Sequence, residues 1–428
     1  MMLRILVFLS LVTTILCAEQ CLDGRLCPDG NTCCAGGCIA SDLGRYNATC
    51  CGDGLTGCGV GYACGEGGFC EATEQVIDPL VQNLPRYQLC HPKHVTLETV
   101  HGFPVDPVNK LAYYSSHGDV AKTDISAVDF VLIVIHGANR NADDYFCAAS
   151  AAVELQSTFS NVLVVVPRFV TVADGPILLQ EGGTALRWRD QDSGPWRYGA
   201  RSVHPIQISS FAITDLLVET LLSRTTANIV LAGHSSGGQF VQRWTLLTSV
   251  WSNRLRSIVA NPSSYAYLTS LRKIHDQWQI PDTKECPHYN QWEWGLQKGG
   301  DIDDEYKRRA MAGRNTTEMI QSFRARDVVY MIGSQDRCNV SSPGWCYSHG
   351  LETSCMDELQ GKMRMERHLN YFESLKLVGI DTHRRLTVEG VGHDHSMMLT
   401  RPEGLSAIFE DLSLLRGPKY NYYQKQPL

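Results

Sequence analysis

A serine lies between two glycines in the segment Gly233-His234-Ser235-Ser236-Gly237, and this spacing suits a nucleophile. A serine on a very tight turn from a strand into a helix needs glycine on either side to avoid steric clash. Such a turn exposes the hydroxyl at the carboxyl edge of a sheet, where the N–H groups of the next helix also point. We therefore predict Ser235 as the nucleophile and Gly233 and Gly237 as the glycines of its elbow. The alternative is a glycine-rich helix start without a catalytic role.

A serine hydroxyl attacks efficiently only when a base accepts its proton, and histidine is the usual base. Two histidines, His393 and His395, follow the last strand that we expect. We predict His393 as the base, because a loop directly at a strand end places its ring over the serine. His395 is the alternative base. A metal site built on both histidines lacks a third clustered ligand, so we predict no metal.

The imidazole needs an acid that holds its tautomer and stabilises its positive charge. Asp336 ends the segment Gly333-Ser334-Gln335-Asp336, which follows the predicted strand 327–332, so we expect its carboxylate at the same edge of the sheet. The alternative is a turn residue, a role that aspartate often has. Asp190 and Asp192 are other acids near turns, but they precede the serine. The chain order serine, aspartate, histidine therefore favours Asp336.

A fourth group of residues suits an oxyanion hole, which binds the negative oxygen that develops during acyl transfer. The segment His136-Gly137-Ala138 follows the apolar run 130–135, and its glycine allows the backbone to approach a ligand closely. We predict that the N–H groups of Ala138 and Ser236 form the hole. The alternative is an ordinary turn into the helix that begins at Ala142. We expect His136 to be a structural hydrogen-bonding residue rather than a second base.

Strands that alternate with helices would bring these loops to one place. Runs rich in apolar and β-branched residues predict strands over 130–135, 161–166, 228–232 and 257–260, and we expect two more strands over 327–332 and 384–388. Helical spacing predicts helices over 142–159, 206–223 and 237–249. This alternation is typical of an α/β fold, in which helices cover both faces of a mostly parallel sheet.

The loop at His136, the elbow at Ser235, the aspartate after a strand and the late histidine together resemble the α/β-hydrolase fold. The resemblance covers roughly residues 95–415. Three segments are similar to a poorly characterised branch of secreted and microbial α/β hydrolases. They are 135–141, 233–238 and Asn261-Pro-Ser-Ser-Tyr265.

The resemblance implies a serine hydrolase of esterase or lipase type, which works through an acyl-enzyme without metal or organic cofactor. We expect a small-molecule or polymeric ester as the substrate. A peptidase or amidase of the same fold stays open, because the same histidine protonates either leaving group. A non-catalytic extracellular binding protein also stays open, because a fold alone does not fix a function.

Two insertions distinguish the large domain from simpler members of that fold, at about 267–313 and 337–360. The first lies where lids commonly occur, and its tryptophans line a substrate pocket or pack internally; they are Trp278, Trp292 and Trp294. The loop 188–192 (Trp-Arg-Asp-Gln-Asp) contacts substrate or holds a structural Arg–Asp pair. The sequence leaves both choices open.

The chain of 428 residues is long enough for one large core and a small additional module. It carries 38 Lys+Arg against 45 Asp+Glu, and its net charge is −7. A nucleic-acid-binding protein needs a basic face to meet phosphates, so we predict no nucleic acid as partner.

Ten of the 17 cysteines lie between Cys21 and Cys70, in a stretch without histidine. Behind a secretion signal, this density predicts disulfides rather than zinc. We therefore expect a disulfide module over 19–70, a linker over 71–89 and the hydrolase domain over 90–428. The segment 27–34 (Cys-Pro-Asp-Gly-Asn-Thr-Cys-Cys) resembles the opening of granulin-type repeats. Two roles for the module over 19–70 stay open: carbohydrate binding and a structural spacer.

Residues 1–18 read as a secretory signal peptide, with Arg4, an apolar run over 5–16 and a small residue at Ala18. Cleavage after Ala18 would remove Cys17 and leave an even number of cysteines. Three glycosylation sequons agree with secretion; they begin at Asn47, Asn315 and Asn339. No later apolar run reaches membrane-spanning length. We predict a secreted, extracellular protein without a membrane anchor.

Overall fold

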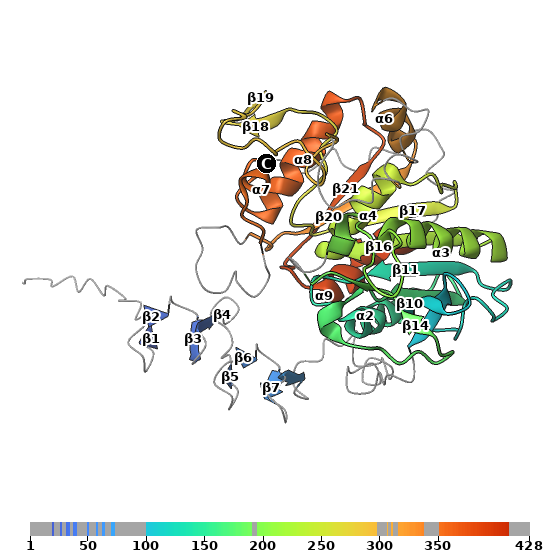
Figure 1. The fold of residues 1–428 in the computed structure, drawn as a ribbon. Helices are drawn as coiled ribbons and strands as arrows, with labels where there is room; N and C mark the ends of the chain where they lie inside the picture. Colours follow the sequence, from blue (N-terminus) through green and yellow to red (C-terminus); the bar gives the residue numbers. More distant parts are fainter. Residues whose placement is uncertain are drawn as a thin grey trace, which may run out of the picture. The chain divides into compact units, whose positions relative to one another are not determined.

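The structure, a computed structural model, describes residues 100–190, 195–297, 316–337 and 351–410, the positions Tyr306 and Ala310, and the backbone of eight short strands between residues 19 and 72. The predicted signal peptide and the sequons at Asn47, Asn315 and Asn339 lie outside these residues, as do most of the predicted linker and part of each insertion. The chain divides into two units, which are described separately (Figure 1).

The cysteine-rich unit contains four antiparallel strand pairs that follow one another along the chain. The pairs are β1(Glu19–Gln20) with β2(Leu26–Cys27), β3(Asn31–Cys34) with β4(Gly37–Ala40), β5(Thr49–Cys50) with β6(Gly57–Cys58), and β7(Tyr62–Cys64) with β8(Cys70–Ala72). Each of these strands is at most four residues long. The disulfide pairing of this unit stays a prediction.

A nine-stranded sheet forms the centre of the large unit, in the order β14-β10-β12-β11-β16-β17-β20-β21, with β9 also paired to β10. From β12 to β21 all neighbours are parallel, whereas β10 is antiparallel to β9 and to β12. The strands are β9(His101–Pro104), β10(Asn109–Ser115), β11(Phe130–Ile135), β12(Val162–Pro167), β14(Thr184–Ala185), β16(Asn228–His234), β17(Leu255–Ala260), β20(Asp327–Gly333) and β21(Arg384–Val388).

Helices cover both faces of this sheet (Figure 1). They are α2(Ala142–Leu155), α3(Ser210–Arg224), α4(Ser236–Leu247), α6(Thr316–Arg324), α7(Cys355–Glu358), α8(Arg364–Leu377), α9(His395–Thr400) and α10(Pro402–Phe409). Smaller elements are the parallel pair β13(Val170–Thr171) and β15(Arg187–Trp188), the hairpin β18(Arg272–Ile274) and β19(Gln277–Gln279), and the 3-10 turns η4(Val172–Asp174) and η5(Pro195–Tyr198).

Strand β11 shows why the sheet needs a helical layer on each side. Its six residues are all buried, and successive side chains enter different apolar clusters. Val131 and Ile133 pack with residues of α3, α4 and α8, whereas Leu132 and Val134 pack with residues of α2, α9 and α10. This is the alternation of a strand that is covered on both faces. The prediction of a mostly parallel sheet between two helical layers is confirmed.

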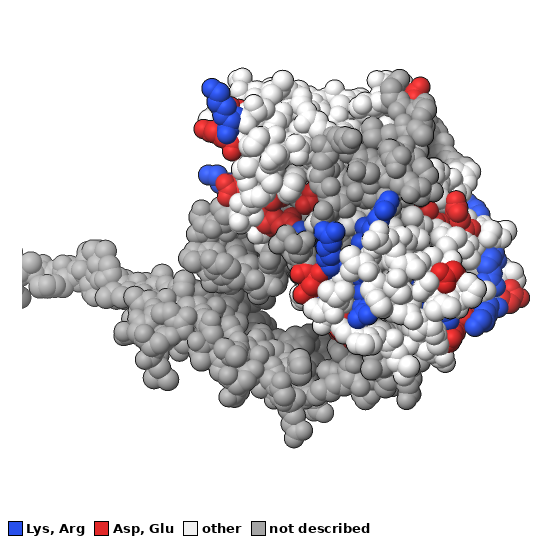
Figure 2. Space-filling view, in the orientation of Figure 1, with Lys and Arg blue, Asp and Glu red and all other residues white. Residues whose placement is uncertain are grey.

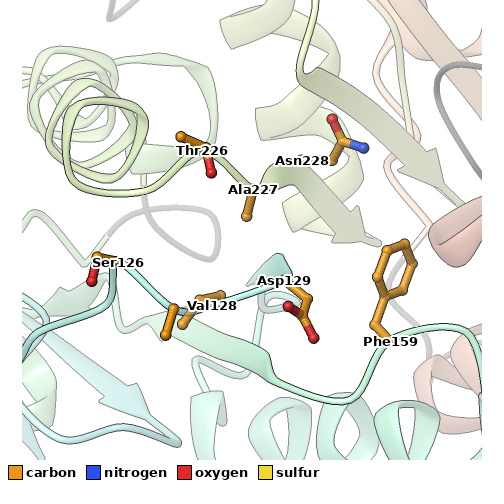
Figure 3. A pocket seen from close by; sticks show the side chains of 8 residues that line it. Ser126, Val128, Asp129, Phe159, Thr226, Ala227 and Asn228 are labelled. Atoms are coloured by element: carbon orange, nitrogen blue, oxygen red, sulfur yellow. The ribbon is translucent and has the colours of Figure 1, made fainter.

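The two edges of the parallel strands differ. A shallow hollow of about 400 Å³ lies at the amino edge, where β11 and β16 begin, and Asp129, Phe159 and Asn228 are among its lining residues (Figure 3). The loops that carry the predicted site residues follow the carboxyl ends of β11, β16, β20 and β21 instead. The hollow is therefore separate from the predicted site.

On the face shown in Figure 2, acidic and basic side chains of the described residues are interspersed rather than gathered by sign. No helix among the residues that the structure describes is both long enough and apolar enough to cross a membrane.

Candidate active site

Ser235 lies on the turn between β16 and α4, in a backbone conformation that non-glycine residues rarely adopt (φ 58°, ψ −120°). A Cβ on Gly233 would lie 2.1 Å from the carbonyl oxygen of Gly237. A Cβ on Gly237 would lie 2.1 Å from the carbonyl oxygen of Ile135. Any larger residue at either position would collide with backbone, so the turn requires both glycines. The backbone N–H of Ser235 donates to the Ala260 carbonyl at 2.9 Å, which ties the turn to β17.

The three residues predicted as nucleophile, base and acid come together at the carboxyl edge of the sheet. The Oγ of Ser235 lies 2.9 Å from Nε2 of His393, and Nδ1 of His393 lies 2.7 Å from Oδ2 of Asp336. Because the ionised carboxylate only accepts, the proton lies on Nδ1 and Nε2 is left as an acceptor for the serine proton. This is the tautomer that a base for serine requires.

Asp336 is buried, and its charge is stabilised by several donors. Oδ2 accepts hydrogen bonds from His393 and from Nδ2 of Asn261 (2.7 Å), and Nη1 of Arg364 lies 3.6 Å from Oδ1. Burial by itself would raise the pKa of Asp336. The hydrogen bond from His393, the charges of Arg364 and His393 and the hydrogen bond from Asn261 outweigh burial and lower the pKa to about 2. The acid therefore stays ionised at neutral pH.

His395, the alternative base, lies in a different place from His393. It is the first residue of α9, and its ring stacks on Tyr145 with the centroids 4.1 Å apart. Burial lowers its pKa. The hydroxyl of Tyr145 lies 2.9 Å from Nδ1 of His234, whose ring is 4.6 Å from that of His393. His395 thus packs on the aromatic side of the site, and it is His393 that reaches Ser235.

The predicted oxyanion-hole residues flank Ser235. A Cβ placed on Gly137 would lie 3.6 Å from Cβ of Ser235, so the loop after β11 passes directly beside this serine. Ser236 is the first residue of α4, where a backbone N–H has no partner within the helix. Within the described ranges, neither the N–H of Ala138 nor that of Ser236 donates to a protein acceptor. Both are available to a developing oxyanion.

His136 is a buried structural residue. Its Nε2 accepts from the N–H of Phe169 at 2.9 Å, so Nδ1 carries the proton and donates to the carbonyl of Gly137 at 2.8 Å. Burial lowers its pKa to about 3. Because the Gly137 carbonyl also accepts the N–H of Arg140, the peptide between Gly137 and Ala138 is fixed from its carbonyl side. The N–H of Ala138 must point the other way.

Asn261 and Arg364, the two further residues at Asp336, were not predicted as site residues. Asn261 directly follows β17, so the signal that identified Asp336, a polar residue in the loop after a predicted strand, was present there too. Arg364 is the first residue of α8 and has no comparable signal, because only folding brings it to Asp336.

The tryptophans of the insertion mainly hold structure. Trp292 is buried, and its indole N–H donates to the carbonyl of Tyr198. Trp294 donates to Asp357, and Trp278 donates to Glu373. Trp188 is the last residue of β15, is buried and donates to the Ala200 carbonyl, and Gln191 and Asp192 lie outside the described residues. Each of these indole N–H groups therefore has a protein partner, and the role of the tryptophans in a substrate pocket stays open.

No family model matches this chain, and neither does any curated protein. Solved structures similar to it include poly(aspartic acid) hydrolase-1 from Sphingomonas sp. KT-1, 19% identical with a TM-score of 0.46, covering 70% of this chain and 95% of that one. LpqC, a poly(3-hydroxybutyrate) depolymerase from Bordetella parapertussis, is 17% identical with a TM-score of 0.44, covering 74% of this chain and 91% of that one. The esterase Est22 is 12% identical with a TM-score of 0.36, and the match covers 74% of this chain and 79% of Est22.

We assign the fold from the chain's own sheet and the placement of its site. One antiparallel strand, β10, precedes a run of parallel strands whose order places β12 before β11. The serine turn follows the central strand β16, and the loops of Asp336 and His393 follow β20 and β21. Strand order, elbow and chain order agree, and the large unit of this protein has the α/β-hydrolase fold.

Proposed function

We propose that this protein is a serine hydrolase that cleaves carboxylic esters through an acyl-enzyme formed on Ser235. One observation carries the proposal: Ser235 Oγ, His393 and Asp336 form a continuous chain of hydrogen bonds of 2.9 and 2.7 Å at the carboxyl edge of the sheet. A serine with a base and an oriented acid is the arrangement that activates a hydroxyl for attack on a carbonyl.

In this proposal each group has a step. Ser235 Oγ attacks the ester carbonyl while Nε2 of His393 accepts its proton, and the charge of Asp336 stabilises the imidazolium that forms. The N–H groups of Ala138 and Ser236 donate to the negative oxygen of the tetrahedral intermediate. His393 then gives its proton to the leaving alkoxide. Water, activated by the same imidazole, attacks the acyl-enzyme and restores the serine.

The preference for esters over amides rests on the resemblance of the sequence to esterase-type hydrolases. We also propose that the enzyme acts outside the cell. The disulfide between Cys286 and Cys355 supports this, since structural disulfides persist in oxidising compartments. In this proposal the cysteine-rich unit is a module attached to the enzyme. Two roles for it stay open: it binds a carbohydrate, or it is a structural spacer without a ligand.

A fluorophosphonate probe, which phosphonylates an activated serine, tests the assignment. We expect the wild-type protein to be labelled and to hydrolyse p-nitrophenyl esters, and Ser235→Ala to lose both activities while it keeps the wild-type circular dichroism spectrum. Ser406→Ala is the matched control, because Ser406 is exposed on α10 and alanine suits a helix surface. A folded wild-type protein that the probe does not label would reject the hydrolase and favour a binding protein.

A further inference from the structure

Asn261 has an unusual position at the end of β17. Its side chain is fully buried, and its backbone has a left-handed conformation (φ 48°), which asparagine tolerates better than most residues. Its backbone N–H donates to the carbonyl of Met331 at 3.0 Å, which fixes the residue between β17 and β20. The side chain is thereby directed toward the loops that follow β20 and β21.

The side-chain amide of Asn261 joins these two loops. Nδ2 donates to Oδ2 of Asp336 at 2.7 Å and to the backbone carbonyl of Gly392 at 3.3 Å. Both partners can only accept hydrogen bonds, so the NH₂ group and not the amide oxygen must face them. One side chain therefore contacts the acid itself and the residue immediately before the base.

We propose that Asn261 is a positioning residue that sets the distance and orientation between Asp336 and His393. This inference rests on the proposed function, in which these two residues prepare Ser235 for attack. A neutral NH₂ group suits the task, because it supplies a donor to the carboxylate without a competing charge. Other bonds also connect the two loops, such as the N–H of Gln335 to the carbonyl of Val391, but Asn261 is the one that reaches the Asp336 carboxylate.

The charged and titratable groups around His393 come from several elements. Asp336 lies on the β20 loop, and Arg364 of α8 stands behind it. The ring of His234, from β16, is 4.6 Å away, and Asp394 and His395 follow His393 in the chain. Of these groups Asn261 contacts Asp336, and it also donates to the backbone carbonyl of Gly392, so a change at Asn261 acts on His393 through the carboxylate and through the residue before the base.

Two substitutions test the hydrogen bonds of the Asn261 side chain separately from the conformation of its backbone. Asn261→Gly keeps the left-handed conformation but removes both hydrogen bonds, and we expect the rate of fluorophosphonate labelling to fall by about tenfold or more, as misplaced catalytic groups do. We also expect the far-downfield proton resonance of the His393 Nδ1–H to broaden or shift upfield. A role in folding alone would leave this resonance in place in the folded variant.

Asn261→Asp retains the shape of the side chain and makes the donor depend on pH. Two adjacent carboxylates share a proton at low pH, and that proton restores a donor toward Asp336. The labelling rate relative to wild type should therefore fall as the pH rises and the shared proton is lost. Asn253→Asp is the matched control, because Asn253 is exposed in the turn before β17, and the length of this strand, about 20 Å, separates it from Asn261. The labelling rate of this variant relative to wild type should not vary with pH.

The outcomes are distinct. An Asn261→Gly protein labelled within twofold of the wild-type rate, with an unchanged downfield resonance, would refute the proposal. So would a relative rate of Asn261→Asp that does not vary with pH. If the wild type is never labelled but its downfield resonance is altered in Asn261→Gly, the proposed hydrolase fails while the positioning role of Asn261 stands.

Discussion

At the scale of single residues, the charge of Asp336 links the site to the stability of the protein. The pKa of this carboxyl is about 2 in the folded protein, below its ordinary value of 3.8. A carboxyl whose pKa is lower in the folded than in the unfolded state stabilises the fold above the unfolded value, and this stabilisation disappears as the pH falls through the folded value. The pH window for Asp336 is therefore about 4 down to 2.

We predict that the free energy of unfolding of the wild type falls by about 2 kcal/mol more than that of Asp336→Asn as the pH is lowered across this window. Urea denaturation at a series of pH values measures this difference. The asparagine variant keeps the shape of the side chain and removes the titration. Parallel pH dependences for the two proteins would show that Asp336 is not held ionised by its neighbours.

The residues of the site were predictable to different degrees. Ser235, Asp336 and His393 each lie within five residues after the end of a predicted strand, and their types and chain order carry the chemistry, so local sequence was sufficient to propose them. The orientation of the Ala138 peptide depends on His136 and Arg140, which only the folded backbone reveals. Arg364 was out of reach, because burying an arginine beside Asp336 depends on tertiary packing and leaves no pattern in the sequence.

At the scale of elements, the disulfide between Cys286 and Cys355 joins the insertion after β17 to α7. The segment before α7 carries Glu352, whose carboxylate accepts from Arg197 at 2.5 Å and from Gln239 at 2.8 Å. Gln239 lies on α4, and its backbone N–H donates to the carbonyl of Ser235. The disulfide thus anchors a segment that packs against the first turn of α4, the helix that follows Ser235.

We predict that the double variant Cys286→Ser/Cys355→Ser loses about 2–4 kcal/mol of unfolding free energy, because the open chain gains freedom in the unfolded state. Equilibrium unfolding in guanidinium chloride under non-reducing conditions measures the loss. Each single variant breaks the same bond, so the single losses should not add up to that of the double variant. Two additive single losses would mean that the cysteines act independently.

The elements themselves were predicted unevenly. Each of the six predicted strands is present, and β11 and β21 have the predicted ends. The apolar run of β11 marks a strand buried on both faces, whereas β21 is mostly only partly buried. The strands β9, β10 and β14 went unpredicted. They pair at the antiparallel side of the sheet, and two of them are only four and two residues long, which is too short to show a period. The insertion 267–297 forms mostly turns, which hydrophobic periodicity does not reveal.

At the scale of the whole molecule, the predicted secretion route determines which chain is the mature protein. Expression in a eukaryotic host with the native leader should give a secreted protein that begins at Glu19 and carries glycans on Asn47, Asn315 and Asn339. N-terminal sequencing and intact mass before and after glycosidase treatment measure both features.

The matched control for this prediction is a chain without residues 2–18, which should stay in the cytosol unglycosylated. A full-length chain that remains inside the cell with Met1 in place would contradict the prediction. It would also place the Cys286–Cys355 disulfide in a reducing compartment, where such bonds are rare.

The order of strands has a consequence for how activity is lost. Ser235 follows β16, which is paired on both sides in the middle of the sheet, whereas His393 follows β21, which closes the described order and pairs only with β20. Terminal strands open more readily than central ones in fluctuations that leave the rest of a domain intact. A brief opening of β21 would separate the base from a nucleophile that stays in place. We therefore expect the proposed hydrolase to lose its activity before it unfolds, and to regain it when β21 pairs again.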